Sequence, residues 1–124
     1  MQLSEQAPED RYFVRSLGPD SIRIVDEDWR QSLLLTPGAV TPWPVSTLDQ
    51  LNDEALAPIL EHQPDVVLLA TGRRMRFPDH RTRVELLRRN IGLEVMTLDA
   101  AARTFNVLAG EERRVLAAMI WETA

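Results

Sequence analysis

The sequence predicts an α/β domain of the mixed α+β kind, built around one mixed β-sheet. The chain has 124 residues, which is close to the commonest size of a single domain. Its first part alternates polar and apolar residues between turns, as half-buried antiparallel strands do. Its second part alternates helical apolar spacing with an unbroken apolar run, which is typical of parallel strands joined by helices. We expect a disordered tail over residues 1–10 and one globular domain over 11–124.

The first half of the domain is expected to be an antiparallel meander. Three runs have strand character: residues 12–15, 21–25 and 31–35. A turn is expected at 26–28, where three acidic residues follow one another. Residues 36–46 carry three prolines and predict an extended loop or an irregular edge strand, because proline cannot donate to a sheet ladder. Trp43, inside this stretch, is interpreted as a core residue under the loop.

A helix followed by a buried strand is expected next. Thr47 and Gln50 have the spacing of a capping box, and apolar residues follow at roughly helical intervals as far as residue 60. Pro58 is expected to kink or split this helix. In residues 65–70, Asp65 is followed by an unbroken apolar run, which predicts a strand buried on both faces.

The rest of the chain predicts three helices and one strand. Asp79 should cap a helix over 80–89, with Val84, Leu87 and Ile91 on its inner face. Residues 93–96 predict a strand parallel to the one at 65–70. The remaining helices are expected from Thr97 to 109 and over 111–122.

Composition excludes several classes of site. The chain has no cysteine, so disulfides, thiolate zinc sites, iron–sulfur clusters and cysteine nucleophiles are ruled out. His62 and His80 have no co-ligands at metal-binding spacing, so no metal and no cofactor are expected. The beginning of the chain does not resemble a secretory signal, and no apolar run is long enough to span a bilayer. A cytoplasmic location fits these observations.

The charge distribution singles out one segment. The net charge is −5, which argues against general nucleic-acid binding, and all 14 basic residues are arginines. Seven arginines lie in residues 73–89 with only two acids, which gives that segment +5 and leaves −10 for the remainder. A coding bias toward arginine explains the missing lysine most simply. The alternative is a surface that faces anions, because arginine forms bidentate bonds to carboxylate and phosphate.

The candidate site is a corner formed by Thr71, Gly72, Arg73 and Arg74. These residues follow the buried strand 65–70, and ligands of open α/β sheets bind at the carboxyl ends of strands. The alternative is a plain turn with solvated arginines. The segment lacks the P-loop lysine and the dinucleotide glycine fingerprint. Because exposed arginines contribute little to stability, replacing Arg73 and Arg74 by alanine is expected to leave the melting temperature unchanged.

Two further residues are candidates for the same corner. Asn106 is a polar residue on an otherwise apolar helix. Its amide is expected to bond a loop backbone, for example near Gly72, or to recognise a ligand. Arg113 is expected either to point to this corner or to pair with neighbouring surface glutamates.

Several segments together resemble a widespread family of small uncharacterised α/β domains that includes the mitochondrial respiratory complex I assembly factor 3. The resemblance is densest from residue 64 to 120 and rests on the order and spacing of five stretches: residues 64–72, 76–78, 91–96, 102–108 and 112–115. It implies a three-layer fold around a central mixed sheet and no established enzymatic activity. For the mitochondrial member it implies a helper role in assembling a membrane complex through protein–protein contact.

Two functions follow as hypotheses. The first is a non-catalytic interaction or assembly protein that has an unidentified protein partner and binds no nucleic acid; its oligomeric state stays open, with a monomer favoured. The second is a binding protein for a small anion, or an enzyme, with its site at the carboxyl end of strand 65–70. A deep pocket with convergent polar groups at that end would favour the second hypothesis.

Overall fold

The computed structural model describes residues 11–111 and 113–122. The tail expected over 1–10 lies outside the described residues. The elements in chain order are β1 Val14–Leu17, β2 Ile22–Ile24, β3 Glu27–Trp29, β4 Leu33–Thr36, β5 Ala39–Pro42, the 3₁₀ helix η2 Leu48–Gln50, α2 Asp53–Glu61, β6 Val66–Ala70, α3 His80–Leu87, β7 Gly92–Met96, α4 Leu98–Gly110 and β8 Val115–Met119.

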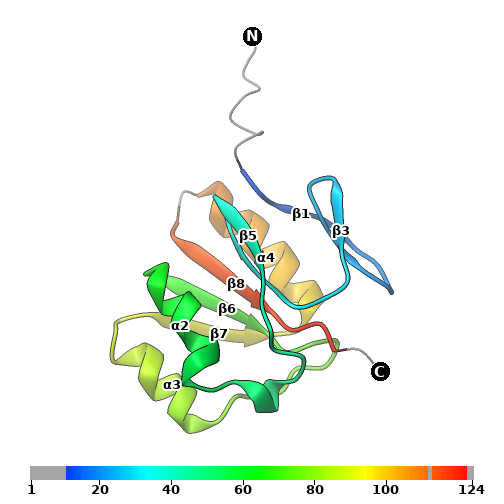
Figure 1. The fold of residues 1–124 in the computed structure, drawn as a ribbon. Coiled ribbons are helices and arrows are strands. Elements are labelled where there is room, and N and C mark those ends of the chain that lie inside the picture. The colour runs from blue at the N-terminus through cyan, green and yellow to red at the C-terminus, as the bar shows by residue number, and fades with distance from the viewer. Residues whose placement is uncertain (1–10, 112, 123–124) are drawn as a thin grey trace.

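The described strands form two sheets (Figure 1). The larger is mixed and has the order β5-β4-β8-β6-β7, and the smaller is antiparallel with the order β1-β2-β3. β6 pairs in parallel with both β7 and β8, whereas β4 is antiparallel to β5 and β8. The predicted parallel pairing is confirmed, with Val66 opposite Gly92 and Ala70 opposite Met96.

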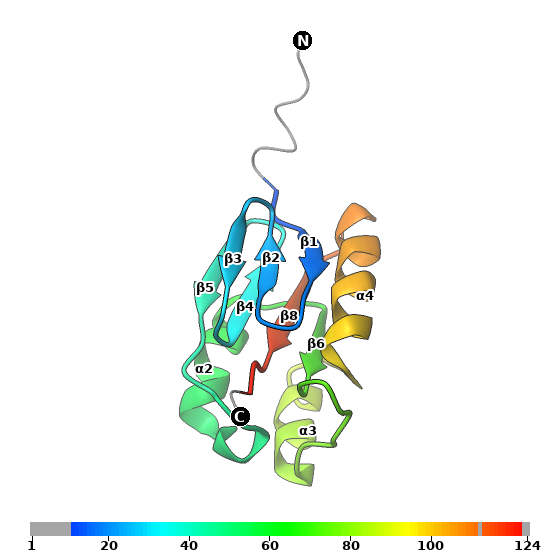
Figure 2. The same cartoon turned by 90° about the vertical axis from the view of Figure 1, so that its right-hand side faces the viewer.

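Three layers result from covering both faces of the larger sheet. One face packs against α4 and the smaller sheet, and the other packs against α2 and the residues around it. Figure 2 shows α4 and α2 on opposite sides of the strands. β6 and β8 are buried along their whole length, because successive side chains enter opposite apolar clusters. The predicted mixed fold class is therefore confirmed.

The first half of the chain differs from prediction in how its strands are divided between the two sheets. The acidic stretch expected to be a turn is mostly strand β3, and the chain reverses just before it at Val25, which has a positive φ of 54°. The run over 31–35 becomes β4, which belongs to the larger sheet and not to the meander. Leu33, Leu34 and Leu35 are all buried, and only a strand covered on both faces accommodates three such residues in a row.

The proline-rich stretch contains an edge strand, which is one of the two structures expected for residues 36–46. β5 pairs only with β4. Trp43 follows it and is 3% exposed, and its indole N–H donates to the carbonyl of Ala55 at 3.0 Å. This residue is thus part of the core, as predicted.

The last predicted helix, over 111–122, is wrong. Residues 115–119 form strand β8, in the middle of the larger sheet. The physical reason is burial on every side, since each residue from Val115 to Trp121 is buried. A helix at the surface would have left one face of this run in water.

The helices of the other face differ in detail. The capping box of Thr47 and Gln50 is present, but it begins only η2, and a second cap at Asn52 begins α2. Pro58 lies inside α2 without splitting it. The predicted inner face of α3 is wrong at two positions: Val84 and Leu87 are exposed, whereas Leu86 and Thr82 are buried.

The expected cap of α3 is confirmed and has a consequence for stability. The Asp79 carboxylate accepts hydrogen bonds from the N–H of Thr82 at 3.0 Å and from its hydroxyl at 3.1 Å. These bonds hold the pKa of Asp79 below its ordinary value of 3.8. A carboxyl with a depressed pKa in the folded state stabilises the fold above its unfolded pKa. That contribution is lost as the pH falls through the lower folded pKa.

We therefore expect Asp79→Ala to lower the melting temperature at pH 7 and to have a progressively smaller effect as the pH falls below the ordinary pKa of 3.8 and through the lower folded value. Thermal melts across this range measure the effect. Asp79→Asn is the matched control, because asparagine caps a helix equally well without a charge. An Asp79→Ala penalty that is the same at pH 7 and in acid would contradict this account.

Candidate functional site

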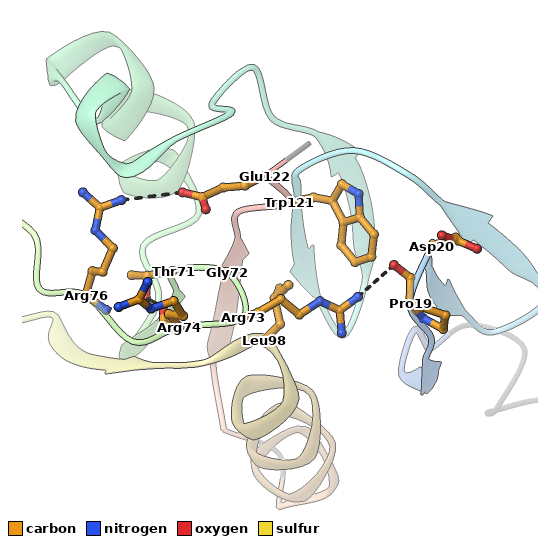
Figure 3. Close-up of a pocket in the computed structure, with 10 residues that line it drawn as sticks. All are labelled: Pro19, Asp20, Thr71, Gly72, Arg73, Arg74, Arg76, Leu98, Trp121 and Glu122. Carbon is orange, nitrogen blue, oxygen red and sulfur yellow. Dashed lines mark hydrogen bonds and ion pairs between the residues drawn. The ribbon is translucent and has the colours of Figure 1, made fainter. Parts of the chain in front are cut away.

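A cleft of about 760 Å³ lies at the carboxyl ends of β6 and β8 (Figure 3). Its lining comes from four segments that are distant in sequence: Pro19 and Asp20, residues 71–74 with Arg76, Leu98, and Trp121 with Glu122. Because β6 and β8 are parallel, the segments that follow them leave the sheet at the same edge. The cleft therefore lies at the corner that the sequence analysis proposed as the candidate site.

Thr71 organises the loop that follows β6. Its N–H continues the sheet by donating to the carbonyl of Met96 at 3.0 Å. Its hydroxyl donates to the carbonyl of Arg74 at 3.0 Å and accepts from the N–H of Arg76 at 2.9 Å. Because Thr71 is almost fully buried and makes both bonds, its hydroxyl serves the loop and is not presented to a ligand.

Gly72 is required by its backbone conformation. Its φ is +98°, a value that side-chain-bearing residues rarely adopt. A Cβ atom at this position would lie 3.4 Å from Oε1 of Glu122. Its carbonyl accepts from the N–H of Leu98 at 2.9 Å, which joins the loop to the first turn of α4. The glycine thus brings a carboxylate close to the backbone of the loop.

Arg73 connects the loop to the smaller sheet. Its guanidinium donates to the carbonyls of Gly18 at 2.6 Å and Pro19 at 3.2 Å, in the turn between β1 and β2. It also lies 5.0 Å from the ring centre of Trp121, within the range of a cation–π contact. Figure 3 shows this side chain extended toward Pro19. Arg73 therefore has a structural role that its sequence context did not indicate.

The two other arginines of the cleft differ in their partners. Arg76 lies between two carboxylates, 3.7 Å from Glu122 and 3.9 Å from Asp49. The guanidinium of Arg74 makes no hydrogen bond or ion pair with any residue in 11–111 or 113–122. Arg74 is thus the cation of the cleft that is available to an incoming anion.

Four of the six predicted site residues line the cleft, and two lie elsewhere. Thr71, Gly72, Arg73 and Arg74 are together. Asn106 instead bonds the backbone of β1: its side chain donates to the carbonyl of Val14 at 2.8 Å and accepts from the Val14 N–H at 3.0 Å. This confirms the expectation of a backbone partner but places that partner in β1, away from Gly72.

Arg113 lies at the opposite end of the central strands from the cleft. It precedes β8, whose first residue, Val115, pairs with Val66 at the beginning of β6. Thr71 follows the other end of β6, so the length of the strand separates Arg113 from the cleft. The expectation that it points to the corner depended on a helix over 111–122, which the strand β8 replaces.

Sequence reasoning missed the contribution of Trp121 and Glu122, because both were assigned to that helix. The unbroken apolar run from Val115 to Trp121, like the one in β6, was the available signal for a buried strand. It also missed two apolar side chains beside the arginines. Met75 and Phe77 are 49% and 66% exposed.

Two other kinds of feature, metal sites and membrane-spanning helices, were sought among the described residues. They contain no group of three or more histidine, aspartate or glutamate residues arranged to hold a metal ion. None of their helices combines the length and the apolar character needed to cross a membrane.

The different roles of Arg73 and Arg74 correct the expectation that both can be removed at no cost. We expect Arg73→Ala to lower the free energy of unfolding by about 1 kcal/mol, since it removes hydrogen bonds to two carbonyls at an exposed site. Arg74→Ala should change it by less than about 0.5 kcal/mol. Urea denaturation of the two variants measures the difference, and equal stabilities would refute the structural role of Arg73.

A similar test applies to Asn106. Asn106→Ala leaves the N–H and carbonyl of the buried Val14 without their side-chain partner, and should cost about 1–2 kcal/mol of unfolding free energy. Val107→Ala is the matched control, because the neighbouring side chain is 60% exposed on the same helix. Chemical denaturation compares both with the parent chain. If the two substitutions cost the same, the bonds to Val14 do not stabilise the packing of β1 on α4.

Comparison with known proteins gives related sequences and structures. The chain is 35% identical over 86 residues to the NADH dehydrogenase [ubiquinone] 1 alpha subcomplex assembly factor 3 of Danio rerio, an alignment that covers 68% of this chain and 49% of that protein. The chain thus spans about half the length of this relative.

Two solved structures are similar over nearly the whole domain. One, from Xanthomonas campestris, has a TM-score of 0.83 and 40% identity and covers 98% of this chain and 92% of that one. The other, from Bordetella pertussis and described as a Mth938-like domain, has a TM-score of 0.80 and 25% identity and covers 98% and 93%. A family model matches residues 14–120. The chain belongs to the family described as "Protein of unknown function (DUF498/DUF598)".

Proposed function

We propose that this chain is a non-catalytic, assembly-factor-like protein that acts through contact with a protein partner. The name of the Danio rerio relative supports an assembly role. We propose further that the contact surface consists of the loop over residues 71–77 and the adjoining cleft, which we call the loop–cleft surface. The absence of cysteine is compatible with a reducing compartment, and we place this role in the cytoplasm.

The single observation that carries this proposal is the pair of exposed apolar side chains beside the arginines. Phe77 is largely exposed and Met75 half-exposed, on a loop that is anchored by Thr71 at one end and by Asp79 at the other. Aromatic residues, methionine and arginine are the residue types enriched where proteins contact one another. A loop that is hydrogen-bonded at both ends and presents all three is well suited to dock on a partner.

The lining of the cleft gives less support to an enzyme. Its hydroxyl group, on Thr71, is buried and bonded within the loop. Neither His62 nor His80 is among its lining residues, so the described part of the cleft offers no pairing of a nucleophile with an imidazole base. A small anionic ligand at Arg74 is the second candidate, favoured by the volume of the cleft and by a guanidinium that has no partner among residues 11–111 and 113–122.

The proposal predicts that removing the two apolar side chains abolishes partner capture. Met75→Ser with Phe77→Ser should reduce the partner recovered by affinity purification from native cells about tenfold or more, because a few buried anchors supply most binding energy at an interface. Quantitative mass spectrometry measures this loss. NADH dehydrogenase subunits are the partners that the relative's name leads us to expect.

A matched control is available in the same chain. Leu87 and Val107 are also exposed, at 69% and 60%, but lie on α3 and α4. Leu87→Ser with Val107→Ser removes comparable apolar surface and should leave capture unchanged. Equal loss in both double variants, or no loss in either, would argue against the loop–cleft surface as the contact site.

A further inference from the structure

A carboxylate of the chain itself occupies part of the cleft. Glu122 leaves the end of the β8 segment and places Oε1 3.4 Å from the position of a Cβ on Gly72. Its other oxygen, Oε2, lies 3.7 Å from a guanidinium nitrogen of Arg76, as Figure 3 shows. The cleft therefore brings together a glycine backbone and an arginine around one carboxylate.

This carboxylate is held loosely. The side chains of Arg76 and Glu122 are 49% and 39% exposed, and their separation is long for an ion pair. Exposed pairs of this kind contribute little to stability. Within residues 11–111 and 113–122, no hydrogen bond fixes the Glu122 carboxylate, so it can leave without disturbing the fold.

Further donors at the same place have no acceptor. The N–H groups of Gly72, Arg73 and Arg74 take part in none of the hydrogen bonds formed among the described residues. Gly72 is itself buried, so its N–H is poorly placed for bulk water. Together with the guanidinium of Arg74, which has no partner among the described residues, these N–H groups are available to an anion.

We propose that Glu122 occupies a carboxylate subsite of the cleft, and that an aspartate or glutamate side chain of an acidic partner segment displaces it. The inference rests on the proposed function and names the chemistry of the partner. Three arginines line the cleft, Arg73, Arg74 and Arg76, against the carboxylates of Asp20 and Glu122, so its lining carries a net positive charge that complements such a segment. Glu122 then acts as an internal competitor that weakens the binding of anything less acidic or less extended than the partner.

A polypeptide fits the site better than a small ion does. Arg76 also lines a second hollow of about 270 Å³, whose other lining residues are Leu48, Leu51, Phe77 and Pro78 and the polar Asp49, Asp79 and Thr82. A carboxylate subsite and a hollow that offers apolar side chains are thus adjacent, joined through one arginine. A segment that carries an acidic residue next to an apolar one would use both, whereas an isolated anion would use only the first.

The test measures binding of a fluorescein-labelled octaglutamate peptide by anisotropy at low salt. We expect Glu122→Gln to bind it about three- to tenfold more tightly than the parent chain, because the competitor is removed and the competent fraction rises. Arg74→Gln should bind it more weakly. Glu61→Gln is the matched control: it makes the same substitution at an exposed glutamate of α2 that lines neither hollow, with the same change in net charge.

Several results would overturn the inference. They are tightening by Glu61→Gln equal to that of Glu122→Gln, which would indicate a general charge effect; no change in Glu122→Gln; no binding of octaglutamate to any variant; and displacement by inorganic phosphate as effective as by unlabelled octaglutamate, which would indicate a small-anion site. Thermal melts should show all three variants folded like the parent. Because partner capture depends on Met75 and Phe77, its persistence alongside any of these results would leave the proposed function standing and remove only the carboxylate subsite.

Discussion

The burial of two adjacent parallel strands, β6 and β8, determines the rest of this structure. Every residue of both strands is buried, and their side chains enter apolar clusters on both faces of the sheet. Because a strand of this kind needs a cover on each side, α4 with the small sheet and α2 with its neighbours are required together. β8 also bridges the antiparallel pair β4–β5 and the parallel pair β6–β7, so one strand holds the two halves of the chain in a single sheet.

The same constraint creates the cleft. Parallel strands end at a common edge, so the segments after β6 and β8 emerge side by side, and the glycine at 72 lets them approach closely. Arg73 fixes a third segment, the turn between β1 and β2, against this edge. The loop therefore presents Arg74, Met75 and Phe77 on a frame tied to both sheets.

Local signals predicted much of this arrangement. The acceptor side chains of Asp79 and Thr97 identified the beginnings of α3 and α4, and the unbroken apolar run identified β6 and its parallel neighbour. Four residues of the cleft followed from the rule that ligands bind at the carboxyl ends of such strands. These features depend on residues close together in sequence.

The failures have a common cause in contacts distant in sequence. Residues 115–119 include two alanines, which favour helix in isolation, and only the flanking strands β4 and β6 make them a strand. Whether Asn106 bonds β1 or Gly72 depends on how α4 packs, which no local pattern records.

β8 is also the last described strand to be synthesised although it lies in the middle of the sheet. While the ribosome is still making it, β4 and β6 each have an unpaired inner edge, and a nascent domain with open edges is exposed to mispairing with other chains. The pairing of β8 with β4 and β6 therefore completes the central sheet late, through contacts between residues far apart in the sequence.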